Sequence, residues 1–303
     1  LHRLIRRQRQ MCIRDRQGLF AWLMSAPALI LIIAFFLIPF FMSVYYSFTD
    51  KMLASPPGTT VQFKGLDNYI KLFQSDAVKN AFINTTKYVL IVVPFIMILA
   101  TLLAIFVNQK LRGIGIFRTI YFSPQVVTMT VVAVVWSFIF SPSNDGMLNS
   151  ILNLLRIEPQ RWLKDPKLAL LCIAIMYIWQ ALGLQMVIVL GGLQYIPEDL
   201  YEAAKLDGCN ALQRTLYITL PCLKNTLVYV LVSNTISAMK IFTQVFVLTQ
   251  GGPNGSTTTM VYQIYQSGFT DKQLAFSSAI SVVFFLVVFA ISKIQNYLLE
   301  RGE

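Results

Sequence analysis

Long apolar stretches alternate with short polar connections along almost the whole chain. A continuous apolar run of about 20 residues matches the hydrocarbon thickness of a bilayer. Backbone groups find no hydrogen-bond partner in lipid, so continuously apolar segments of this length are expected to be helices. The pattern predicts an all-α integral membrane protein with six transmembrane helices, at about Leu19–Phe48, Thr85–Val107, Thr119–Phe140, Leu168–Leu193, Thr226–Leu248 and Leu274–Leu298.

Composition agrees with this fold class and excludes several chemistries. Hydrophobic residues make up 56% of the chain and charged residues 13%, about half of the share usual in globular domains. The single histidine, His2, lies near the start, so no His-based triad or multi-histidine metal site can form inside the fold. The four cysteines lack C-x-x-C spacing, and the chain has no G-x-x-x-x-G-K-[ST] phosphate loop. We therefore expect no catalytic residue, metal site or cofactor in this chain, and any energy from ATP would have to come from another subunit.

The net charge of +11 does not indicate a nucleic-acid-binding protein. Residues 1–16 hold six arginines against one acidic residue and account for nearly half of the excess. The run Met11–Arg16 resembles a spurious terminal sequence of translated genome assemblies. Residues 1–18 are interpreted as a cytoplasmic tail that can be artefactual, and residues 19–303 as one transmembrane domain.

The connections between the apolar stretches indicate the orientation of the chain. Residues 108–118 carry three basic residues and no acidic one, and such loops stay in the cytoplasm. This places both termini in the cytoplasm. The outer connections 49–84 and 141–167 are each long enough for a short surface helix, such as Leu148–Leu155.

The connection between the fourth and fifth stretches, residues 196–221, is typical of a helix–glycine–helix element. Pro197 starts a helix with an acidic first turn, which suits the helix dipole. Ala203 and Ala204 keep this helix slim, so that another protein can approach its backbone. Gly208 breaks the helix before a second amphipathic one. The residues alone leave two interpretations open: an element that a partner protein binds, or an interfacial helix that only joins two spans.

A specific spacing within this segment resembles a known family. Glu202-Ala203-Ala204, three residues, Gly208, nine residues and Ile218-Thr-Leu-Pro221 are similar to the EAA loop of permease subunits of bacterial ABC importers. Further matches resemble the sugar-permease branch and extend over about residues 18–298: Gly65-Leu-Asp-Asn-Tyr69, Asn84-Thr85, Phe117-Arg118-Thr119, Trp162-Leu163, Ile178-Trp179, Gly192-Leu-Gln-Tyr-Ile-Pro197 and Thr249-Gln-Gly-Gly-Pro253.

The resemblance implies an assembly and a mechanism. The expected architecture is that of a type I ABC importer permease in the bacterial cytoplasmic (inner) membrane. The partners would be a second, different permease subunit, two ATPase subunits that use ATP and Mg²⁺, and an external solute-binding protein. The EAA element would dock in a cleft of an ATPase subunit. The residues assigned to this coupling role are Glu202, Ala203, Ala204, Asp207 and Gly208.

Polar side chains inside the spans are candidates for the translocation pathway, because they are costly in a membrane. Tyr177, Gln180 and Leu184 share one helical face of the fourth span, and Asn234, Ser237 and Ile241 share one of the fifth. The resemblance places sugar contacts on these two helices. Hydrogen bonding between helices is the alternative role for such side chains. Lys240 is the only charge well inside a span, and we expect it to border the pathway.

The favoured function is a permease subunit that translocates a sugar delivered by an external binding protein. A glycerol-phosphate or other polar-solute importer is the alternative within the class. A secondary transporter or channel is the alternative from another class, although proton-coupled carriers usually need an intramembrane carboxylate and all fourteen acidic residues lie outside the six stretches. A membrane scaffold or insertase would not need the EAA spacing.

Overall fold

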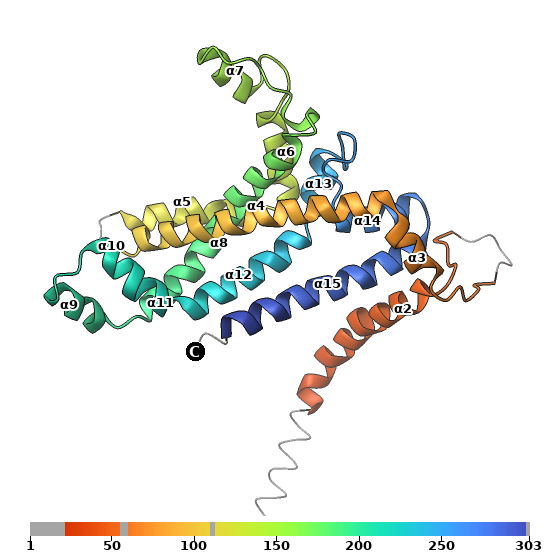
Figure 1. Cartoon of the computed structure of the whole chain (residues 1–303), viewed down its shortest axis with the longest axis horizontal. Coiled ribbons are helices and arrows are strands. Elements are labelled where there is room, and N and C mark those ends of the chain that lie inside the picture. The colour runs from red at the N-terminus through yellow and green to blue at the C-terminus, as the bar shows by residue number, and fades with distance from the viewer. Residues whose placement is uncertain (1–21, 55–59, 110–112, 301–303) are drawn as a thin grey trace, which may run out of the picture.

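The computed structural model describes residues 22–54, 60–109 and 113–300 (Figure 1). Within this part the chain is helical apart from its connections, and an isolated β-bridge joins Thr49 to Phe63. The predicted all-α class is confirmed, while the tail expected at residues 1–18 lies outside the described residues. The α-helices are α2 (Ile38–Ser47), α3 (Asp67–Gln74), α4 (Asp76–Val107), α5 (Ile114–Val126), α6 (Met129–Ile139), α7 (Met147–Leu154), α8 (Ala169–Gln194), α9 (Glu198–Leu206), α10 (Ala211–Arg214), α11 (Leu220–Cys222), α12 (Lys224–Met239), α13 (Thr243–Leu248), α14 (Met260–Tyr265) and α15 (Leu274–Glu300).

Five helical segments of the described residues are long and apolar enough to cross a membrane. They are Trp22–Ser47, which includes α2, then α4, α8, Lys224–Leu248, which joins α12 to α13, and Leu274–Leu299 within α15. Each coincides with a predicted span, because a continuous apolar run is a direct signal of a membrane helix. Only α4 differs clearly, since it begins at Asp76, well before the predicted Thr85.

The third predicted span is not the single helix expected over Thr119–Phe140. It is divided into α5 and α6, which are bent by 100° at the break between them. Val127 and Thr128 have extended backbones, with ψ of 135° and 142°, and Pro124 lies just before them inside α5. Proline removes a helical hydrogen bond and crowds the preceding turn, so Pro124 weakens the end of α5 just before the break. The described residues contain six spans if the bent pair counts as one.

α4 and α8 form the centre of the bundle, and α5 and α12 pack beside them (Figure 1). Large buried side chains such as Tyr88, Ile96 and Ile173 fill the space between these helices. A glycine allows one very close crossing: a Cβ atom on Gly183 of α8 would lie 2.0 Å from the carbonyl oxygen of Tyr121 in α5. Small residues let membrane helices approach in this way, so α5 lies directly against the backbone of α8.

The first span leaves the bundle. Its α2 part contacts α15, where the rings of Phe40 and Phe285 are 5.2 Å apart, and it then diverges from the other helices (Figure 1). No residue in the most hydrophobic window of this span is buried within the chain. Its apolar surface is therefore left to lipid or to another chain.

The two ends of the bundle carry different elements (Figure 1). At one end, here called the α3 end, the connection 249–259 is tied to the start of α4. The amide Nδ2 of Asn84 donates to the carbonyl oxygens of Gly255 (2.8 Å) and Thr258 (3.1 Å). The opposite end, here called the α9 end, carries α9, α10 and α11, and α15 runs toward this side of the molecule. The arrangement separates the EAA-like segment from the α3 end by the length of the bundle.

Candidate functional site

The EAA-like segment forms the helix–glycine–helix element that its sequence predicts. α9 begins at Glu198 after Pro197, with Glu198 and Asp199 in its first turn and Lys205 in its last, so its charges complement the helix dipole. Gly208 follows α9 with a φ of +78°, a left-handed conformation that glycine adopts without steric cost. The helix therefore stops where the glycine is, and the chain turns back toward the bundle.

Four of the five predicted coupling residues are exposed on this element, namely Glu202, Ala203, Asp207 and Gly208. Ala204 is the exception, because it is 6% exposed and lies against the rest of the chain. Of the two alanines, Ala203 is thus the one whose backbone another protein can approach from outside. Two large apolar side chains of α9, Leu200 and Leu206, are also exposed, at 44% and 89%. The outer face of α9 is thus a mixed charged and apolar surface, which also includes the exposed Lys205.

The inner face of the element is attached firmly to the membrane helices. Ile196, before α9, and Leu223, after α11, are buried in one apolar cluster with Val107 of α4 and Val189 of α8. The hydroxyl groups of Tyr201 and Thr219 are 3.0 Å apart and form a hydrogen bond between the two halves of the element. The buried residues on both sides of α9 thus pack directly against α4, α8 and α12.

A polar cavity of about 450 Å³ lies among α5, α6, α8 and α12. Its polar lining residues are Gln125, Thr128, Tyr177, Gln180, Gln185 and Ser237. This volume falls in the range of small-molecule sites. Amide and hydroxyl groups beside apolar surface suit a neutral, hydroxyl-rich molecule, because they both donate and accept hydrogen bonds.

The structure brings three of the five predicted pathway residues to this polar cavity, together with Leu184 of the same predicted helical face. Tyr177, Gln180 and Leu184 line it from α8, as their helical spacing predicts, and Ser237 lines it from α12. The amide Nε2 of Gln180 donates to the carbonyl oxygen of Val127 at 3.0 Å, so it ties α8 to the break between α5 and α6. Gln180 therefore serves helix packing as well as lining the cavity.

The other predicted pathway residues lie elsewhere. Asn234 is 1% exposed, and within the described residues neither amide atom of its side chain has a hydrogen-bond partner. Ile241 is buried in the apolar cluster around Tyr88. Lys240 is exposed at the end of α12 and is not among the residues that line the cavity. A role for Asn234 and Lys240 in the pathway stays a prediction.

Sequence reasoning missed one wall of the cavity. Gln125 and Thr128 line it from the break between α5 and α6, and Gln185 lines it from α8. The available signal was Pro124 followed by a glutamine within an otherwise apolar stretch. A proline next to a polar side chain in a span often marks irregular backbone, which membranes tolerate only where it is buried in protein or lines a cavity.

Comparison with known proteins identifies the family. Residues 80–302, well over half of the chain, match the family described as binding-protein-dependent transport system inner membrane component. The chain belongs to this family. The permease is 31% identical over 293 residues to YurN of Bacillus subtilis, a probable ABC transporter permease, covering 95% of this chain and 99% of the relative. It is 33% identical to the lactose transport system permease protein LacF of Rhizobium radiobacter, over 91% and 92% of the two chains.

Solved structures share the fold of the permease. A chain from a crystal structure of a bacterial ABC transporter that imports the acidic polysaccharide alginate superposes with a TM-score of 0.82 at 22% identity, covering 96% of the permease and 99% of that chain. The expected fold of an ABC importer permease is thus confirmed. The predicted resemblance to this family is confirmed over nearly the whole chain.

Proposed function

We propose that this permease forms half of the pathway of an ATP-driven sugar importer. The main observation in support is a continuous series of packing contacts. It runs from α9, whose outer face is exposed, through the buried Ile196 and Leu223 to the helices that line the polar cavity. Relatives named as sugar permeases support the substrate class, among them LacF and the arabinooligosaccharides permease AraP of Bacillus subtilis, which is 32% identical. The uncharged polar lining of the cavity agrees with a sugar.

In the coupling step, α9 binds to a cytoplasmic ATPase subunit. The exposed Glu202 accepts hydrogen bonds or a salt bridge from that subunit, and the slim surface at Ala203 admits close contact. ATP and Mg²⁺ are bound and used by two such ATPase subunits, so this chain performs no catalysis. Closure of the ATPases moves α9 and rocks the attached helices between inward-open and outward-open states. The α9 end, together with both termini, lies in the cytoplasm.

The remaining partners complete the pathway. A second, different permease subunit supplies the other wall, and a solute-binding protein delivers the sugar at the α3 end. The alternative within the class is import of glycerol phosphate or another polar solute. Lys240 is the side chain that would attract an anionic solute, but none of the described residues that line the polar cavity is charged, which favours a neutral solute.

A pair of glycine variants tests the coupling role. Gly208 and Gly113 both have a positive φ, of +78° and +86°, and in both cases a Cβ would meet no atom within 4 Å. Gly208→Asp and Gly113→Asp therefore introduce the same charge and the same backbone strain, of about 1–2 kcal/mol. In the complete transporter reconstituted in vesicles, Gly208→Asp should abolish sugar uptake and Gly113→Asp should keep most of it, with both inserted at normal levels.

The energy source of uptake distinguishes the proposed importer from a secondary transporter or channel. Uptake by the reconstituted wild-type transporter should require ATP and should survive collapse of ion gradients. Full uptake by Gly208→Asp, or uptake driven by an ion gradient without ATP, would contradict the proposed function. Competition by unlabelled sugars and by glycerol phosphate identifies the solute class.

A further inference from the structure

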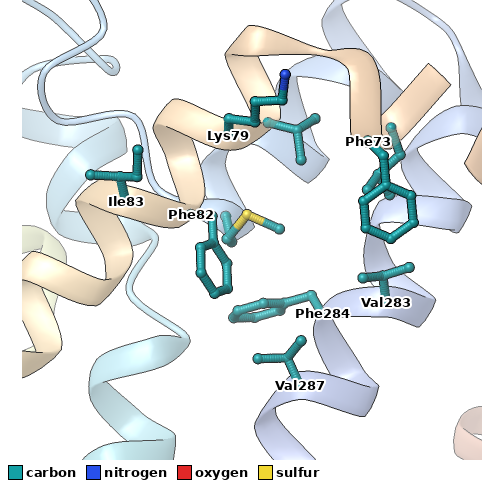
Figure 2. Close-up of a pocket in the computed structure, with 10 residues that line it drawn as sticks. Phe73, Lys79, Phe82, Ile83, Val283, Phe284 and Val287 are labelled. Atoms are coloured by element: carbon teal, nitrogen blue, oxygen red, sulfur yellow. The ribbon is translucent and has the colours of Figure 1, made fainter. Parts of the chain in front are cut away.

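A second, apolar cavity lies at the α3 end, on a different part of the molecule from the polar cavity. It has a volume of about 480 Å³ and lies among α3, α4, α14 and α15 (Figure 2). All the side chains that line it are apolar except Lys79. In Figure 2, the ring of Phe82 lies close to the ring of Phe284, and Lys79 lies at the edge with its amino group pointing away from them. We call this cavity the apolar groove.

The apolar groove is open to the surroundings of the helices. Phe73 of α3 and Phe82 of α4 line it and are 67% and 44% exposed. Its lining continues along α15 from Val283 to Val287, which is the direction toward the α9 end. The groove therefore extends from the level of α3 into the bundle's membrane-spanning part, with a charged residue only at the α3 end.

Lys79, the charged residue of the groove lining, forms an ion pair with Asp76 at the start of α4. The amino group of Lys79 is 3.4 Å from a carboxylate oxygen of Asp76, and the two side chains are 55% and 98% exposed. An exposed pair of this kind contributes little to stability, so either partner is free to exchange its contact. Lys79 is suited to a phosphate and Asp76 to a primary ammonium, both as charge-assisted hydrogen bonds.

We propose that the apolar groove binds a phospholipid with a zwitterionic, primary-amine headgroup, of the phosphatidylethanolamine type. The phosphate contacts Lys79, the ammonium contacts Asp76, and one acyl chain lies along Phe82, Phe284 and Val287. A purely anionic headgroup places negative charge beside Asp76, and a quaternary amine has no hydrogen to donate to it.

Photo-crosslinking with defined lipids tests the site in the complete transporter. Phosphatidylethanolamine and phosphatidylglycerol carrying the same photoreactive acyl chain are each incorporated into nanodiscs, and labelled peptides are mapped by mass spectrometry. The amine lipid should label the segments around Phe82 and Val283 more than the glycerol lipid does, by about two- to five-fold, as expected for exposed ion pairs. Asp76→Asn should remove this preference, because Asp76 contacts the ammonium. Lys79→Gln should instead lower labelling by both lipids, because both carry the phosphate.

A filled-groove variant with a matched control tests the path of the acyl chain. Val283→Trp places a bulky ring inside the groove and should abolish labelling there. Leu286→Trp lies on the same helix, is 56% exposed and is outside the groove, so labelling should be unchanged. Equal labelling by both lipids, persistence of the preference in Asp76→Asn, unchanged labelling by both lipids in Lys79→Gln, or crosslinks from the groove to another subunit in place of lipid would each overturn the proposal. Crosslinking is measured independently of transport, so lipid binding in the groove can be confirmed or refuted whether or not the proposed transport function is correct.

Discussion

Single residues set how closely the helices around the polar cavity approach. At Gly183 the obstacle to a larger side chain is the carbonyl group of Tyr121, which belongs to the backbone of α5 and cannot rotate away. Gly191, two turns further along α8, has open space around the position of a Cβ. The two glycines of this helix thus differ in role. Gly183 allows α5 to cross close to α8, whereas no neighbouring atom lies near a Cβ at Gly191.

Gly183→Ala should destabilise the permease, and Gly191→Ala should not. The new methyl group forces α5 away from α8, and overpacking of this kind costs about 1–3 kcal/mol. Alanine at position 191 meets no neighbour and favours the helix. The measurement is the midpoint of thermal unfolding of the purified complex, which should fall for Gly183→Ala only. Equal midpoints for the two variants would show that the close crossing is absent.

Tyr201→Phe tests the hydrogen bond that closes the EAA-like element. The change removes the bond to the hydroxyl of Thr219, which contributes about 0.5–1.5 kcal/mol, and keeps the ring. We expect fewer sugar molecules transported per ATP hydrolysed, because α9 is attached less firmly to the segment that leads into α11. Tyr217→Phe is the control, since Tyr217 is 77% exposed. The same ratio in both variants and in the wild type would argue against a transmitting role for this bond.

At the scale of elements, the apolar pattern predicted where the spans lie, but it did not predict the bend inside the third span. Pro94 and Pro124 both lie inside apolar stretches, yet α4 continues through Pro94 while α5 ends two residues after Pro124. The local signal is the same, but the contacts differ: at the break after Pro124, the carbonyl oxygen of Val127 accepts a hydrogen bond from Gln180 of α8. The α8 wall of the cavity was predictable because helical spacing fixes a face. The wall at the break was not, because it depends on a contact between distant segments.

The connection between α6 and α8 is held together by one side chain. Asn149 is fully buried. Its amide nitrogen donates to the carbonyl oxygens of Ser143 (3.0 Å) and Gln160 (3.1 Å), and its amide oxygen accepts from the indole of Trp162 (2.8 Å). The predicted surface helix at Leu148–Leu155 is present as α7, but this network, not the helix itself, gives the connection its shape.

Asn149→Ala should loosen this connection without unfolding the permease. Loss of several buried hydrogen bonds at about 1 kcal/mol each should speed amide hydrogen exchange in residues 141–164 by roughly tenfold or more. Asn153→Ala is the control, because Asn153 makes a single exposed contact of 3.3 Å with Asn144. Exchange is read by mass spectrometry. Equal protection in the two variants would contradict the central role of Asn149.

For the whole molecule, the proposed mechanism requires that the polar cavity open to opposite sides in turn, and Ser237 is placed to report it. The side chain lines the cavity and is exposed. In a chain whose four cysteines are replaced, Ser237→Cys should react with a membrane-impermeant thiol reagent from the α9 side without nucleotide. With the ATPases trapped in the ATP-bound state, it should react from the α3 side instead, because ATP binding shifts the population of states. Ser281→Cys on α15 lies outside the cavity lining and should show no such exchange of sides. Reaction of Ser237→Cys from the same side in both states would mean that the cavity is not part of an alternating pathway, whatever α9 binds.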